Sequence, residues 1–178
     1  MQRKRIWILG VLTGCSSAPS PVDGFVVDPT CGRTAPLGLT IGQPAADGSF
    51  QRIDDESPPQ RVFGPQGGQH LLLDLALADP SDEAAATLVV LQAARCSQEE
   101  PAACETDVLG RVEVITRPGD AQHQPLADGT LRLGSYFLVL RDWPEEQPRS
   151  VTASVQDACG RSAATSIWVA PQAQQDTR

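Results

Sequence analysis

The residues best suited to covalent chemistry in this 178-residue chain are its five cysteines. No C-x-x-C pair occurs, and neither histidine, His70 or His123, is spaced with a cysteine as zinc ligands are. One cysteine stands alone near the N-terminus, and the other four form an even set that an exported protein would pair into two disulfides. The five positions are Cys15, Cys31, Cys96, Cys104 and Cys159.

The segment before Cys15 has the layout of a secretory signal. Three basic residues at 3–5 precede an apolar run at 6–11, which is too short to span a bilayer. Residues 12–15, Leu-Thr-Gly-Cys, resemble the lipobox of bacterial lipoproteins. The resemblance implies cleavage before Cys15, acyl chains on Cys15 that attach the protein to the membrane, and, with Ser16 next, export to the outer membrane.

The Gly-rich stretch at 64–70, G-P-Q-G-G-Q-H, is the most distinctive candidate ligand loop. One interpretation makes His70 a base or a metal ligand. A phosphate-binding loop is excluded because it requires Lys-Ser/Thr after the glycines, and Gln69-His70 stands there. We favour a turn and bulge that lead into a strand, with His70 exposed or bonded to the backbone. His70 then stays a candidate partner contact.

Clusters of acidic residues at 54–56, 99–100 and 145–146 each lie in an expected loop beside proline. Glycosidase chemistry needs two carboxylates held roughly 5–9 Å apart on rigid elements, which neighbouring loop residues do not provide. An irregular cation site at 79–83 is an alternative to solvated loop charge, which we favour. G-x-S-x-G is absent, so we expect no enzyme, no cofactor and no metal site.

Trp143 is the one aromatic residue in an expected loop of the mature chain. Tryptophan is the residue most enriched at binding hot spots, so Trp143 is a candidate partner contact. A lid folded back on the domain is an equal alternative.

Glycine and proline recur about every ten residues, which favours an all-β chain of short strands. The clearest strand, 70–77, places four leucines on a core face and Asp74 in water. Residues 86–94 are apolar on both faces, as in a central strand, although a short helix is an alternative. The other expected strands are residues 37–41, 50–53, 108–116, 130–133, 136–141, 150–156 and 162–169.

Seven to nine such strands predict a two-sheet sandwich of immunoglobulin or fibronectin type, with a closed barrel as the alternative. In that topology Cys31 precedes the first strand and Cys159 lies in the last hairpin turn, at the same end. Cys96 and Cys104 flank a loop at the opposite end. We therefore predict the disulfides Cys31–Cys159 and Cys96–Cys104, with Gly160 supplying the positive φ of the final turn.

The Gly-rich turn at 64–70 and the D-A-C-G-R sequence at 157–161 resemble small immunoglobulin-like lipoproteins of myxobacteria. The resemblance spans most of 37–170 and implies the same sandwich fold, but that family carries no assigned activity. We expect a signal peptide at 1–14, a lipidated tether at 15–24, the sandwich at 25–170 and a disordered tail at 171–178.

The net charge of −8 argues against nucleic acid as a partner, because phosphate binding needs a basic stripe. Cleavage would leave 11 basic against 22 acidic residues, a net charge of −11. The sequence predicts a non-catalytic binding or structural module of the outer membrane, on its periplasmic face or the cell surface, with an envelope protein or a glycan as partner. A small hydrolase and an apolar-ligand carrier are the alternatives.

Overall fold

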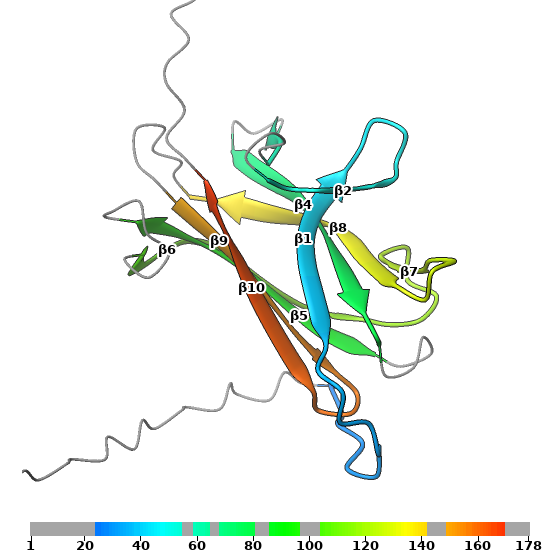
Figure 1. The fold of residues 1–178 in the computed structure, drawn as a ribbon. Helices are drawn as coiled ribbons and strands as arrows, with labels where there is room; N and C mark the ends of the chain where they lie inside the picture. The colour runs from blue at the N-terminus through cyan, green and yellow to red at the C-terminus, as the bar shows by residue number, and fades with distance from the viewer. Residues whose placement is uncertain are drawn as a thin grey trace, which may run out of the picture.

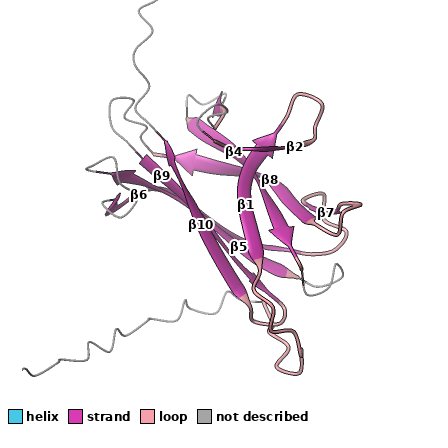
Figure 2. Ribbon diagram, viewed as in Figure 1, coloured by secondary structure: helices cyan, strands magenta, loops and turns pink. Residues whose placement is uncertain are grey.

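The computed structural model describes residues 24–54, 59–64, 68–80, 86–96, 104–141 and 149–169, without the side chains of 104–107. These residues form strands joined by turns and loops, with no helix among them (Figures 1 and 2). Nothing in those ranges is therefore a helix long and apolar enough to cross a membrane. The strands are β1 (Gly38–Pro44), β2 (Phe50–Arg52), β3 (Arg61–Phe63), β4 (Gln69–Ala78), β5 (Thr87–Cys96), β6 (Cys104–Thr116), β7 (His123–Pro125), β8 (Leu131–Leu140), β9 (Arg149–Asp157) and β10 (Ser162–Val169).

The strands form two antiparallel sheets, as Figure 1 shows. Sheet A has the order β2-β1-β4-β8-β7, and β3 pairs with the first residues of β4 beside this path. Sheet B has the order β10-β9-β5-β6. The prediction of a two-sheet all-β fold is confirmed, and two separate sheets replace the closed barrel that was the alternative.

Aliphatic side chains fill the space between the sheets. The leucines of β4 at 71, 73, 75 and 77 have no exposed surface, which confirms the predicted core face. Val89 and Leu91 of β5 and Val151 of β9 face them from sheet B with equally complete burial. Burying one such side chain stabilises a fold by about 1.5–3 kcal/mol, so this seam is the main source of stability.

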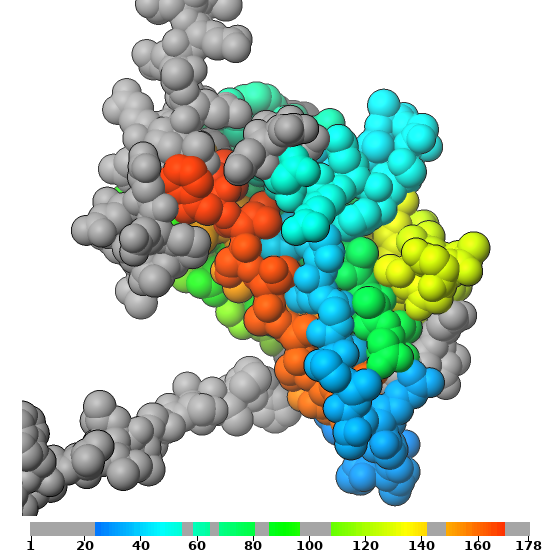
Figure 3. All heavy atoms as spheres, in the orientation of Figure 1, coloured from blue at the N-terminus to red at the C-terminus, as the bar shows by residue number. Residues whose placement is uncertain are grey.

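Strand β10, at the edge of sheet B, lies beside β1 of sheet A. Figures 1 and 3 show β10 of sheet B and β1 of sheet A coming together at their lower ends, where each strand begins, and residues of the two strands are in contact. The free edge of β10 is therefore partly covered by the other sheet, which limits strand addition there.

Several predicted strands need correction. The strand that was favoured at 86–94 forms as β5, Thr87–Cys96, and it is a central strand between β9 and β6. The two strands predicted at 130–133 and 136–141 are one strand, β8, because Gly134 and Ser135 form a bulge within it instead of a turn. Strands β3 and β7 have three residues each and were not predicted, whereas β2, equally short, was predicted at 50–53.

The disulfide Cys31–Cys159 forms as predicted, with Cα atoms 5.2 Å apart across 128 residues of sequence. It joins the segment before β1 to the β9–β10 turn, where Gly160 has the expected positive φ of 77°. Beside it the backbone amide of Asp28 donates to the carbonyl of Ala158 at 2.6 Å. The chain therefore enters the sandwich at the end that holds this turn.

The second predicted disulfide, Cys96–Cys104, stays a prediction. Cys96 is buried and disulfide-bonded, and the β5–β6 register makes Cys104 its Cα partner. Directly opposed residues in antiparallel strands lie at the Cα separation that a disulfide needs. The side chain of Cys104 is outside the described part of the structure, so Cys31–Cys159 is the one disulfide seen in full.

Candidate functional site

Two of the predicted site residues, Cys15 and Trp143, lie outside the described residues, so lipidation and the contact at Trp143 stay predictions. An acidic cation site at 79–83 was the alternative to solvated loop charge; of these residues Asp79 is described and 81–83 are not. The Asp79 carboxylate lies 3.4 Å from Arg33 and 3.4 Å from Arg161. The two guanidinium groups therefore supply the positive charge beside Asp79 that a bound metal cation would otherwise supply.

His70 is half-buried near the start of β4, and the prediction that it is exposed or backbone-bonded is wrong. Its ring meets the ring of Phe137 edge-on, with centroids 6.3 Å apart. Its Nδ1 atom is buried with no hydrogen-bond partner among the described residues. A Cβ on Gly64 would lie 2.7 Å from its Nε2 atom, so glycine there lets the chain approach the ring. The His70 ring therefore packs between Phe137 and the backbone at Gly64.

Asp74 was predicted to lie in water, and the structure buries it completely. Its carboxylate accepts hydrogen bonds from Nε of Arg132 at 2.9 Å, from Nη2 of the same guanidinium, and from Oγ of Ser135 at 2.9 Å. The β8 bulge places Gly134 and Ser135 opposite Asp74, and a Cβ on Gly134 would overlap the carboxylate. Arg132 also donates to the Gly48 carbonyl, so the β1–β2 turn is held to this outer face of sheet A.

Two further side chains of sheet A with polar groups, those of His123 and Tyr136, are also buried. His123, expected in a loop, is in β7 and is buried. Tyr136 shares a 2.6 Å hydrogen bond with the hydroxyl of Thr116. Burial raises the pKa of Tyr136 to about 12, although its hydrogen bond with Thr116 acts to lower this pKa. Tyr136 therefore stays neutral at any physiological pH.

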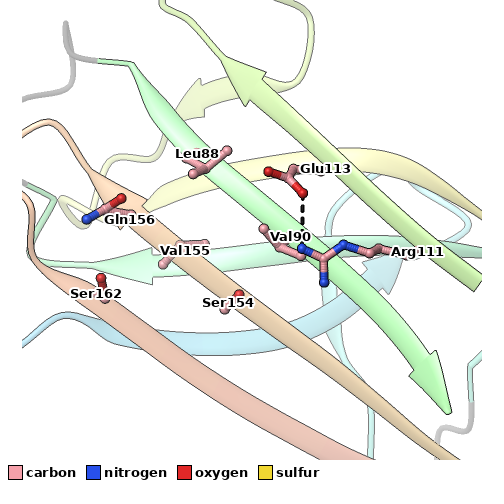
Figure 4. A pocket seen from close by; sticks show the side chains of 8 residues that line it. All are labelled: Leu88, Val90, Arg111, Glu113, Ser154, Val155, Gln156 and Ser162. Atoms are coloured by element: carbon pink, nitrogen blue, oxygen red, sulfur yellow. Dashed lines mark hydrogen bonds and ion pairs between the residues drawn. The ribbon is translucent and has the colours of Figure 1, made fainter. Parts of the chain in front are cut away.

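Sheet B carries a shallow hollow of about 330 Å3 on its outer face, which we call the sheet B hollow (Figure 4). Strand alternation builds it, because inward residues such as Val89 and Ala153 have no exposed surface and their neighbours face outward. Side chains from β5, β6, β9 and β10 meet there. The lining residues are Leu88, Val90, Arg111, Glu113, Ser154, Val155, Gln156 and Ser162.

An ion pair lies at the β6 side of the sheet B hollow. Nη2 of Arg111 lies 3.0 Å from a carboxylate oxygen of Glu113, as the dashed line in Figure 4 shows. Nη1 of Arg111 donates to Oε1 of Gln92 at 3.2 Å. The single cation of the lining is thus bound to its single anion, and the remaining lining side chains are uncharged.

The chemistry available at the sheet B hollow is hydrogen bonding. The hydroxyls of Ser154 and Ser162 line it, but both histidines of the chain lie on sheet A, in β4 and β7. The described residues contain no group of three or more His, Cys, Asp or Glu side chains placed to hold a metal ion. The arrangement therefore places no histidine beside these serines, and its lining offers hydroxyl, amide and ion-paired groups for hydrogen bonding.

Sequence reasoning missed the sheet B hollow, although one local signal pointed to it. Polar residues alternate with small apolar ones along β9, with Thr152, Ser154 and Gln156 on one face. A sheet face with water on it gives the same pattern. Only the pairing of β9 with β5 and β10 shows which side chains stand together.

A comparison with protein families, curated proteins and solved structures finds no match for this chain.

Proposed function

We propose that this protein is an exported, lipid-anchored β-sandwich that acts as a non-catalytic binding module at the cell envelope. The sheet B hollow carries the binding part of the proposal. It lies on a rigid sheet, it is open to solvent, and its lining offers hydrogen-bond donors and acceptors beside aliphatic surface.

Export is supported by the Cys31–Cys159 disulfide, because disulfides persist in oxidising compartments and are rare in the cytosol. The lipobox-like residues 12–15 support the same destination. Attachment through Cys15 would leave 16–24 as a tether of about 30 Å at full extension. That tether would enter the sandwich at the disulfide-bonded end and leave the outer sheet faces free for partners.

The strand order supports an immunoglobulin or fibronectin type of sandwich. Sheet A places β1, β4 and β8 as strands A, B and E, and sheet B places β10, β9, β5 and β6 as G, F, C and C′. Outer faces and loops of such sandwiches commonly bind partners. The sandwich fold alone does not identify a ligand.

The anchor is tested by metabolic labelling with a radioactive fatty acid and by membrane fractionation. The full chain should incorporate label and sediment with membranes, and Cys15→Ser should lose both. Ser17→Ala is the matched control and should behave as the wild type. Label that persists in Cys15→Ser, or an unlabelled wild-type chain, would refute the anchor.

A further inference from the structure

Five of the eight residues that line the sheet B hollow come from β5 and β9, the two strands of sheet B that pair on both sides. Strand β5 pairs with β6 on one side and with β9 on the other, and β9 pairs also with β10. A peptide ligand that adds as a strand needs a free sheet edge. A ligand that lies over β5 and β9 must therefore be recognised through side chains.

Charge does not select the ligand either. The guanidinium of Arg111 is bound to Glu113 and to Gln92, so an anionic ligand would have to displace a carboxylate already in place. The whole chain carries a net charge of −8, which repels anions at long range. A cationic ligand would have to displace Arg111 from Glu113. The favoured ligand is uncharged.

Polar and apolar side chains stand next to one another across the sheet B hollow. In the strand register Gln156 lies between Ser162 on β10 and Leu88 on β5, and Ser154 lies beside Val90. Outward residues of one strand repeat about every 6.6–6.8 Å. Amide and hydroxyl groups both donate and accept hydrogen bonds, while the partly exposed side chain of Val90 offers C–H surface beside them.

We infer that the sheet B hollow binds a neutral saccharide, a ligand with hydroxyl groups at its rim and C–H groups on its ring faces. Gln156, Ser154 and Ser162 hydrogen-bond the hydroxyls, Val90 contacts a ring face above the buried Leu88, and the Arg111–Glu113 pair offers a planar donor and acceptor. The volume of about 330 Å3 is at the small end of ligand sites, which fits a short saccharide unit. This inference rests on the proposed binding function and names its ligand class.

The test is affinity electrophoresis of the full chain in a sugar-free non-ionic detergent. Native gels contain one neutral polysaccharide each (dextran, amylopectin, galactomannan or mixed-linkage β-glucan) or an acidic one (alginate or polygalacturonate). Ser154→Leu fills the hollow, and Gln156→Ala removes a polar group if the leucine variant fails to fold. Ser166→Leu, exposed on β10 and outside the lining, is the matched control.

The inference predicts that at least one neutral polysaccharide slows the wild-type chain and the Ser166→Leu chain equally. Ser154→Leu and Gln156→Ala should bind that polysaccharide at least about tenfold more weakly, which corresponds to 1.4 kcal/mol. Migration unchanged in every neutral gel, retardation only by the acidic polymers, or retardation unaffected by both variants would overturn it. Acylation and membrane attachment do not depend on the hollow, so an anchored chain that ignores saccharides refutes this inference alone.

Discussion

Replacing Arg161 with alanine should destabilise the disulfide-bonded end of the sandwich more than any surface substitution. The guanidinium donates to the Asp157 carboxylate at 2.9 and 2.8 Å, to the Ala35 carbonyl at 2.8 Å and to the Asp79 carbonyl at 2.8 Å. Only 9% of the Arg161 side chain and 2% of the Asp157 side chain are exposed. One residue thus joins the β9–β10 turn, the end of β4 and the segment before β1.

The loss in free energy of unfolding arises because Arg161→Ala leaves the buried carboxylate of Asp157 without its counter-ion. Breaking a buried ion pair by removing one partner costs about 3–5 kcal/mol. Asp157 keeps two backbone donors, the amides of Cys159 at 3.0 Å and of residue 161 at 2.9 Å, so the lower figure applies. A loss of about 3 kcal/mol lowers the Tm of a domain this size by about 10 °C. The Tm of Arg161→Lys should lie between those of the wild type and Arg161→Ala, because one ammonium group cannot make the forked contact of a guanidinium.

Thermal unfolding of the oxidised protein followed by circular dichroism measures this effect. Arg111→Ala is the matched control, because 47% of the Arg111 side chain is exposed and its pair with Glu113 is open to solvent. An exposed pair contributes at most about 1 kcal/mol, so the control should lose no more than about 3 °C. If Arg161→Ala loses no more than Arg111→Ala, the buried-charge reasoning is wrong.

Three further outcomes are expected. Replacing Cys31 and Cys159 with serine together should lower the free energy of unfolding by up to about 5 kcal/mol in guanidinium titration, since a 128-residue loop is released; an unchanged midpoint would contradict this. Arg132→Met should cost about 3–5 kcal/mol by leaving Asp74 unpaired, and adding Asp74→Asn should recover most of it, whereas additive losses would contradict the pairing. Tyr136 is the only tyrosine, so absorbance titration should show its pKa at about 12 instead of 10.0; the unfolded state then loses its proton first, and the free energy of unfolding falls by about 3 kcal/mol as the pH rises from 10 to 12. A tyrosinate midpoint near 10 in the folded protein would contradict that burial.

The leucine stripe of β4 was predictable because period-two alternation is a local property of the sequence. The Cys31–Cys159 pairing was predictable because strand order places the chain start and the last hairpin turn at one end. Asp74 obeys the same alternation and does point away from the leucines. Its burial depends on Arg132, 58 residues away, and on the bulge opposite it, neither of which the alternation contains.

The sheet B hollow shows the same limit. Its polar residues on β9 were visible as an alternating pattern, but Leu88, Arg111 and Ser162 come from three other strands. Register decides which of them meet, and a shift of one residue would turn each to the other face. The strands and the core were therefore predictable from residue types alone, whereas predicting the sheet B hollow would have required knowledge of which strands pair and in which register.

The most direct test of the exported, lipid-anchored module is the intact mass of the chain taken from its native membrane, with and without reductant. The account predicts a chain that begins at Cys15, carries two or three acyl chains and gains about four mass units on reduction of its two disulfides. A chain that still begins at Met1, without acyl chains and with no mass change on reduction, would contradict it.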